Sequence, residues 1–184
     1  GNAIAELTPE DEVVLNPLAE KPHQISSLTD FFDVTPYPGG DSSDVLALMV
    51  LEHQIQAQNA LLAANFTVRR LLHSSIEMRK ALGEPEMTKP EGTLKRVIES
   101  QARKVVETLL FRDEFIMEGD GVEGGDAFRE AFLENRRPAG DGRSLKDLRL
   151  YERLFKYRCS YVIYTSPFQN LTPWLKAEVF RQLV

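Results

Sequence analysis

This sequence has little cysteine and fewer positive than negative charges. Its only cysteine is Cys159, and its formal net charge is −6. A single cysteine excludes an internal disulfide and every metal or haem-attachment motif that requires several cysteines. The acidic balance argues against a nucleic-acid partner, because general nucleic-acid binders are usually basic.

Long hydrophobic runs are also absent. The longest uninterrupted apolar run, Val45 to Leu51, is far shorter than the roughly 20 residues that span a bilayer. We therefore expect no membrane span in this segment. The chain begins with Gly1 rather than Met, and apolar positions continue up to Val184. We expect that it is cut from a longer protein, so a targeting segment could have been removed with the upstream residues.

No motif for catalysis is present. Ser144 lies in Gly142-Arg143-Ser144-Leu145 rather than in a Gly-x-Ser-x-Gly elbow, and it is more typical of a helix cap. Cys159 could act as a nucleophile, since Lys156 and Arg158 would lower its pKa. Without a surrounding signature, a small buried hydrophobic side chain is the favoured interpretation. These absences favour a non-enzymatic protein without a cofactor.

Metal ligands are equally sparse. The three histidines are His23, His53 and His73, and the last two point about 160° apart on an ideal helix. A carboxylate-bridged di-iron bundle needs paired Glu-x-x-His motifs on separate helices, which this chain lacks. The acidic, glycine-rich stretch 118–126 does not have the spacing of an EF-hand loop. We predict no metal site.

The composition is that of a folded globular protein, with 42% apolar and 27% charged residues among 184. Residues 1–40 are predicted to form a mostly non-helical N-terminal arm, because Pro17, Pro22, Pro36 and Pro38 break the segment repeatedly. Apolar residues in the arm predict that it packs against the rest of the chain. Residues 41–184 are predicted to be a single helical domain.

The segment from Ser43 to Leu82 contains neither proline nor glycine. It is rich in residues that favour helices, and Ser42, Ser43 and Asp44 are suited to cap its start. It predicts one central helix over about 43–82, roughly 60 Å long at 1.5 Å per residue. A kink near Asn65 to Thr67, or a break near Ser74, is compatible with that length. Gly83 is expected to end the helix.

Helical spacing separates two apolar stripes on this segment. A polar strip of Gln54, Gln58, Asn65 and Arg69 runs between them. Because both of its flanks are apolar, we expect the strip to be partly buried and the helix to be covered on two sides. The first stripe is Val50, Ala57, Leu61, Ala64, Val68 and Leu71, and the second is Leu48, Leu51, Ile55, Leu62 and Phe66.

Three further helices are predicted near 94–115, 144–164 and 172–184, with a short one at 127–132. The apolar residues of each follow helical spacing. Tyr157 to Tyr164 could instead form a strand, since Tyr and Val favour sheets, but the spacing favours a helix. The fold class is therefore all-α, an irregular helical bundle around one long central helix.

Two blocks of sequence carry a resemblance. The first is Leu51-Glu52-His53-Gln54 with Asn59 and Ala64-Asn65-Phe66, and the second runs from Gly142 to Asp147 and from Arg153 to Tyr164. Together they resemble the C-terminal region of a family of uncharacterised proteins exported to the bacterial cell envelope, over roughly 44–184. Arg158 stands where that family has Pro. The resemblance implies an extracytoplasmic location and a longer parent protein, but no activity or cofactor.

Two functions follow as hypotheses. The first is a non-enzymatic interaction or structural domain of a larger envelope protein, whose partner is another protein or the rest of its own chain. The alternative is a small-molecule, metal or haem-associated site around His53, with Gln54, Gln58, Asn65 and Arg69 as candidate binding residues. A binding site requires these side chains to line a pocket. An interaction domain requires them to be bonded to one another, with an apolar patch exposed elsewhere.

Overall fold

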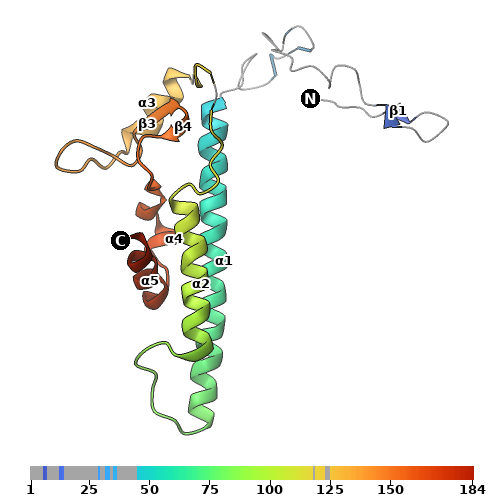
Figure 1. The fold of residues 1–184 in the computed structure, drawn as a ribbon. Helices are drawn as coiled ribbons and strands as arrows, with labels where there is room; N and C mark the ends of the chain where they lie inside the picture. Colours follow the sequence, from blue (N-terminus) through green and yellow to red (C-terminus); the bar gives the residue numbers. More distant parts are fainter. Residues whose placement is uncertain are drawn as a thin grey trace. The chain divides into compact units, whose positions relative to one another are not determined.

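The computed structural model describes residues 6–7, 13–14, 29, 32–33, 35–36, 45–117, 119–122 and 125–184 (Figure 1). The chain divides into two units, Gly1–Ser43 and Asp44–Val184. In the first unit, β1 (Glu6–Leu7) pairs in antiparallel fashion with β2 (Val13–Val14). The remaining predictions for the arm, including its packing through apolar residues, lie outside the described residues.

The second unit is organised around α1 (Val45–Ala81), an uninterrupted helix of 37 residues. Because no proline or glycine occurs in it, nothing removes a backbone hydrogen bond, and neither the kink nor the break takes place. Gly83 follows with φ +68°, and the amides of Gly83 and Glu84 bond back to carbonyls of the last turn, as in a glycine C-cap. The predicted central helix is confirmed.

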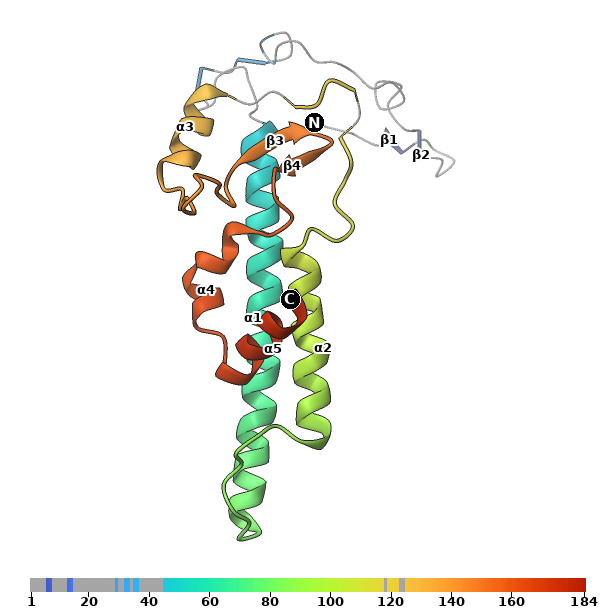
Figure 2. The same cartoon turned by 60° about the vertical axis from the view of Figure 1, so that its left-hand side comes forward.

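Three further helices of nine or more residues complete the bundle. The chain reverses after α1, and α2 (Gly92–Leu109) runs back along it, with α5 (Pro173–Leu183) packed on α2 (Figure 1). The third is α3 (Asp126–Glu134), which lies beyond the end of α2 in both views (Figures 1 and 2). The predominantly helical unit confirms the all-α fold class. None of the described helices is both long and apolar enough to cross a membrane.

One face of α1 supplies the centre of the hydrophobic core. It packs on the apolar face of α2, which in turn packs on α5, and burial of these faces is the main stabilising contribution. The buried core residues of the three helices are Leu46, Val50, Ala57, Leu61, Ala64 and Val68 in α1, Leu94, Ile98, Ala102, Val105, Val106 and Leu109 in α2, and Leu175 and Val179 in α5.

The second apolar stripe of α1 is not covered, which corrects the prediction that the helix is buried on two sides. At 100° per residue, Ile55 lies about 180° from the buried Leu46 and Ala64. Its five side chains are between 50% and 72% exposed. We call this surface the outer face of α1, made of Leu48, Leu51, Ile55, Leu62 and Phe66 together with the amides of Gln58 and Asn59.

The predicted helix over 144–164 is wrong. The chain there forms an antiparallel ribbon of β3 (Leu148–Tyr151) and β4 (Arg153–Phe155), followed by a 3-10 helix, η3 (Tyr161–Tyr164). Leu150 and Glu152 have φ near +60°, a conformation that ends a right-handed helix. The amide of Ser144 donates to the Asp147 carboxylate and the amide of Asp147 donates to the Ser144 carbonyl, but within a turn rather than at a helix start.

The end of the chain follows the prediction more closely. A four-residue helix that the sequence did not indicate, α4 (Ser166–Gln169), precedes α5. Both helices begin with Pro within their first turn, where its missing amide hydrogen is not needed. The helix predicted over 172–184 is confirmed as α5.

Leu61 and Leu62 provide a matched test of these two faces, being 1% and 51% exposed. Leu61→Ala leaves a cavity between α1 and its neighbours and should lower the free energy of unfolding by about 2–5 kcal/mol. Leu62→Ala should lower it by less than about 1 kcal/mol in dilute protein. Urea unfolding followed by circular dichroism measures both values. Equal losses for the two variants would contradict the assignment of faces.

Candidate functional site

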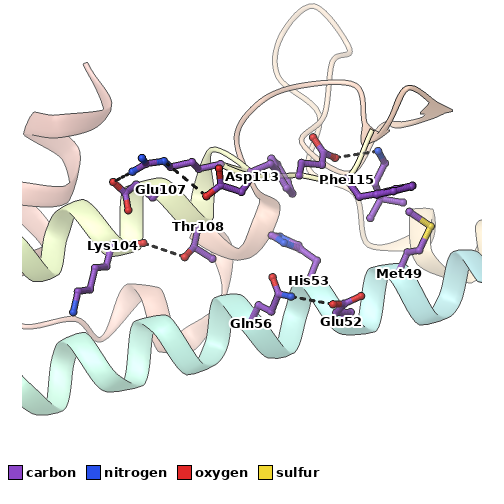
Figure 3. Close-up of a pocket in the computed structure, with 13 residues that line it drawn as sticks. Met49, Glu52, His53, Gln56, Lys104, Glu107, Thr108, Asp113 and Phe115 are labelled. Carbon is purple, nitrogen blue, oxygen red and sulfur yellow. Dashed lines mark hydrogen bonds and ion pairs between the residues drawn. The ribbon is translucent and has the colours of Figure 1, made fainter. Parts of the chain in front are cut away.

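An open groove of about 510 Å³ lies beside His53, between α1, α2 and the turn that follows α2. Figure 3 shows the side chains of α1 along one side and those of α2 along the other, with His53 pointing inward between them. Thirteen residues line the groove: Met49, Glu52, His53, Gln56, Lys104, Glu107, Thr108, Phe111, Arg112, Asp113, Glu114, Phe115 and Leu154.

His53 is held at the base of the groove by a buried hydrogen bond. Its Nε2 lies 2.6 Å from Oγ of Ser160, a side chain with no exposed surface. Ser160 Oγ also accepts from the amide of Val162 at 3.1 Å, which leaves it one proton to donate and one lone pair to accept with. The tautomer of His53 therefore sets the direction of the bond: Nε2 accepts when the imidazole proton is on Nδ1, and donates when the proton is on Nε2.

Aromatic rings enclose the imidazole. The ring of Phe111 lies 4.6 Å away between centroids, and those of Phe155 and Tyr161 lie at 5.8 and 6.2 Å. This apolar surrounding disfavours the charged imidazolium, so burial lowers the pKa of His53 from 6.5 to about 4. His53 is therefore neutral at pH 7.

Ser160 also joins the chain to α2, because its amide donates to the carbonyl of Leu109 at 2.8 Å. A serine bonded to a histidine has the composition of a nucleophile and its base. Here the hydroxyl is fully buried and cannot meet a substrate. The pair therefore has a structural role, with His53 packed at the interface between α1 and the segment that carries Ser160.

Most charged groups of the groove have a polar partner, and Lys104 is the exception among the described residues that line it. Arg112 pairs with Glu107 and lies 3.9 Å from Asp113, while Gln56 donates to Glu52 at 3.0 Å (Figure 3). Glu114 accepts from the amide of Leu154 at 3.2 Å. Apart from the Lys104 ammonium, the charged groups of the rim are satisfied within the protein, so the rim offers little to orient a ligand.

Unsatisfied buried polar atoms do occur elsewhere. Among the described residues, these side-chain atoms are Arg129 Nε, Tyr161 Oη and Thr172 Oγ1, and none of the three residues lines the groove. Burial raises the pKa of Tyr161 to about 12, and Gln54 opposes this by a smaller amount. The Tyr161 hydroxyl and Gln54 do not reach hydrogen-bonding geometry, so their contact is only a weak polar one.

The predicted binding residues are not brought together. His53 is buried, whereas Gln54, Gln58 and Arg69 are exposed and do not line the groove. Asn65 serves another purpose: it donates to the carbonyl of Asn170 at 3.3 Å and accepts from the amide of Thr172 at 2.9 Å, which fixes the start of α5. The polar strip, which was expected to be partly buried, is therefore an exposed row with one half-buried member, Asn65, that anchors α5.

The other candidate residues have ordinary surroundings. Cys159 is half-buried, and burial raises the pKa of its thiol, which reduces its reactivity. No three His, Cys, Asp or Glu side chains in the described part of the chain are grouped to hold a metal ion. Part of the acidic stretch 118–126 lies outside that part. Ser160 was missed by sequence reasoning, because an isolated serine beside a cysteine carries no local signal.

Comparison with known proteins adds no relative. No protein family, curated protein or solved structure matches this chain.

Removing the partner of His53 tests the structural role of the bond. Ser160→Ala leaves Nε2 unsatisfied inside the aromatic shell and should lower the free energy of unfolding by about 1–3 kcal/mol. Ser100→Ala, on the exposed side of α2, should change it by less than about 0.5 kcal/mol. Urea unfolding at pH 7.5 measures both. A Ser160→Ala variant as stable as Ser100→Ala would show that the bond contributes nothing.

The lowered pKa of His53 predicts a pH dependence. Above pH 6.5 the group is neutral in both states, and its contribution to stability is complete. Below pH 6.5 the unfolded state binds a proton that the folded state excludes down to about pH 4, so stability is lost across this range, by up to about 3 kcal/mol. The stability difference between the native chain and His53→Gln should shrink accordingly. A difference that stays constant from pH 7.5 to 4 would contradict it.

Proposed function

We propose that residues 44–184 form a non-enzymatic protein-interaction domain whose contact surface is the outer face of α1. The observation that carries this proposal is the exposure of five large apolar side chains along one side of one helix. Single exposed apolar residues are ordinary, but a row of them on a rigid element is typical of a binding surface.

The distribution of charge supports the same function. No Asp, Glu, Lys or Arg occurs between Glu52 and Arg69, a stretch that includes most of the outer face. The exposed side of α2 provides the contrast, because it carries Lys95, Arg96, Arg103 and Lys104. Depletion of charge is the compositional mark of an interface core, whereas a solvent-facing helix usually carries charged residues.

The alternative function, a small-molecule, metal or haem-associated site around His53, has weaker support. Its observation is the groove, yet the groove is open and, except for Lys104, its charged side chains have partners within the protein. Of the five residues proposed for binding, it contains only His53, whose Nε2 is already bonded to Ser160.

For the setting of this domain we propose a larger bacterial envelope protein. The support is the resemblance over roughly 44–184, together with an exposed surface that a partner would cover. Fractionation of cells that produce the natural protein tests the location. Recovery with the cytosolic proteins would contradict it.

In-cell photocrosslinking tests the interaction function. A photoreactive benzoylphenylalanine replaces Phe66 on the outer face or, as the control, Arg103 on the exposed side of α2. We expect ultraviolet light to give a discrete adduct from position 66 and none from position 103. Only the outer face of α1 is expected to be in contact with a partner protein. Adducts are measured on immunoblots and identified by mass. Equal yields at the two positions, or none at either, would contradict the proposal.

A further inference from the structure

We infer that the partner of the outer face of α1 is the same face of a second copy of this chain, bound in antiparallel orientation. This inference rests on the interaction function proposed above and names its partner. It follows from the spacing of the apolar side chains, from the positions of the charges that flank them, and from the side of α1 that the bundle leaves open.

The apolar side chains have the spacing of helices that pack lengthwise. Leu48, Ile55 and Leu62 are seven residues apart, which is the heptad repeat of coiled-coil seams. Leu51 and Phe66 lie within about 40° of this row at 100° per residue. The seam is thus a narrow stripe along the helix, suited to a second helix rather than to a globular pocket.

The bundle leaves room for that second helix. The core face of α1 is about 180° from the outer face, and α2 lies along the core side in both views (Figures 1 and 2). The turn between α4 and α5 reaches α1 at its flank, where Asn65 bonds Asn170 and Thr172. Within residues 45–117 and 125–184, no helix or strand covers the outer face.

The flanking charges select the antiparallel orientation. Glu52 and Arg70 are eighteen residues apart, which is about five full turns, so both lie on the same flank of the seam about 27 Å from each other. A two-fold axis level with Leu61 brings Glu52 of each copy opposite Arg70 of the other. A parallel pair would instead bring Arg69 and Arg70 of the two copies to one level, where like charges repel.

The same axis places apolar groups together. Leu62 is one residue from the axis, so its two copies meet at the centre of the seam. Ile55 precedes the axis by six residues and Phe66 follows it by five, so each Ile55 is level with the partner's Phe66 to within about 1.5 Å. The apolar and the charged residues thus agree on one register.

The polar groups of the face are compatible with contact between identical surfaces. A two-fold interface sets a patch against itself, so charge within the patch would face its own sign. Gln58 and Asn59 are uncharged, and their amides both donate and accept hydrogen bonds. Glu52 and Arg70 are exposed and therefore accessible, and Arg70 forms no ion pair with any described residue.

Sedimentation velocity of the full chain over a range of concentrations tests the association. We expect a reversible monomer–dimer equilibrium that Leu62→Arg abolishes, because it brings two arginines together at the axis. Arg103→Glu on α2 is the control and should leave the dissociation constant unchanged. Circular dichroism melting checks that each variant folds, and Ile55→Lys serves as a second disrupting variant. A chain that is monomeric at every concentration, or a dimer that survives Leu62→Arg, overturns the inference.

Charge exchange tests the register. Glu52→Arg alone and Arg70→Glu alone should each weaken the dimer by about tenfold, because two pairs are lost and like charges face each other. The double variant E52R/R70E should restore the native dissociation constant to within about twofold, since the pairs are reversed rather than removed. Additive weakening in the double variant overturns the register.

Engineered cysteines test the orientation in a Cys159→Ser background. I55C/F66C should form disulfide-linked dimers under mild oxidation, whereas I55C alone should not, because residue 55 meets residue 66 of the partner. Efficient crosslinking of I55C alone overturns the antiparallel arrangement. If the chain stays monomeric while benzoylphenylalanine at position 66 captures a different protein, this inference fails and the interaction function stands. If position 66 captures nothing, the interaction function itself fails.

Discussion

The hydrogen bond between His53 and Ser160 joins three parts of the chain that are distant in sequence. Its two atoms are 2.6 Å apart, and Ser160 bonds in turn to the end of α2 and to the start of η3. These contacts set the ring of His53 against Phe111, Phe155 and Tyr161. A buried polar pair has few alternative geometries, because an unmatched partner costs desolvation free energy. The pair therefore fixes how the ribbon and η3 attach to the helical hairpin.

Asn65, further along α1, likewise fixes the position of a segment that is distant in sequence. By bonding Asn170 and Thr172 it fixes the turn between α4 and α5, so α5 reaches α2, where Gln182 bonds the carbonyl of Glu99 at 3.1 Å. Between His53 and Asn65 the core face of α1 is apolar and buried. The central helix thus provides a rigid support on which irregular segments are positioned by two polar side chains.

The helical framework of this fold was predictable from sequence because local chemistry decides it. The absence of proline and glycine explains the length of α1, and Gly83 marks the end of that helix. Thr172-Pro173 marks the start of α5. The segment 144–164 was not predictable, because the spacing of Leu145, Leu148 and Phe155 fits a helix as well as it fits the observed ribbon. What decides against a helix there is the positive φ of Leu150 and Glu152, which depends on tertiary contacts. In the candidate site, His53 could be singled out, but the partner 107 residues away could not.

The outer face of α1 shows why a hydrophobic pattern alone cannot identify what covers it. Periodicity records that Leu48, Ile55 and Leu62 share one side of a helix, and it is the same whether the covering element belongs to this chain or to another. Composition around the stripe carries the missing information. Gln54, Gln56, Gln58 and Asn59 are exposed amides, which keep the face soluble without the fixed charge that would oppose an apolar partner. A face built in this way favours reversible association over permanent burial, since each monomer folds around the opposite side of the same helix.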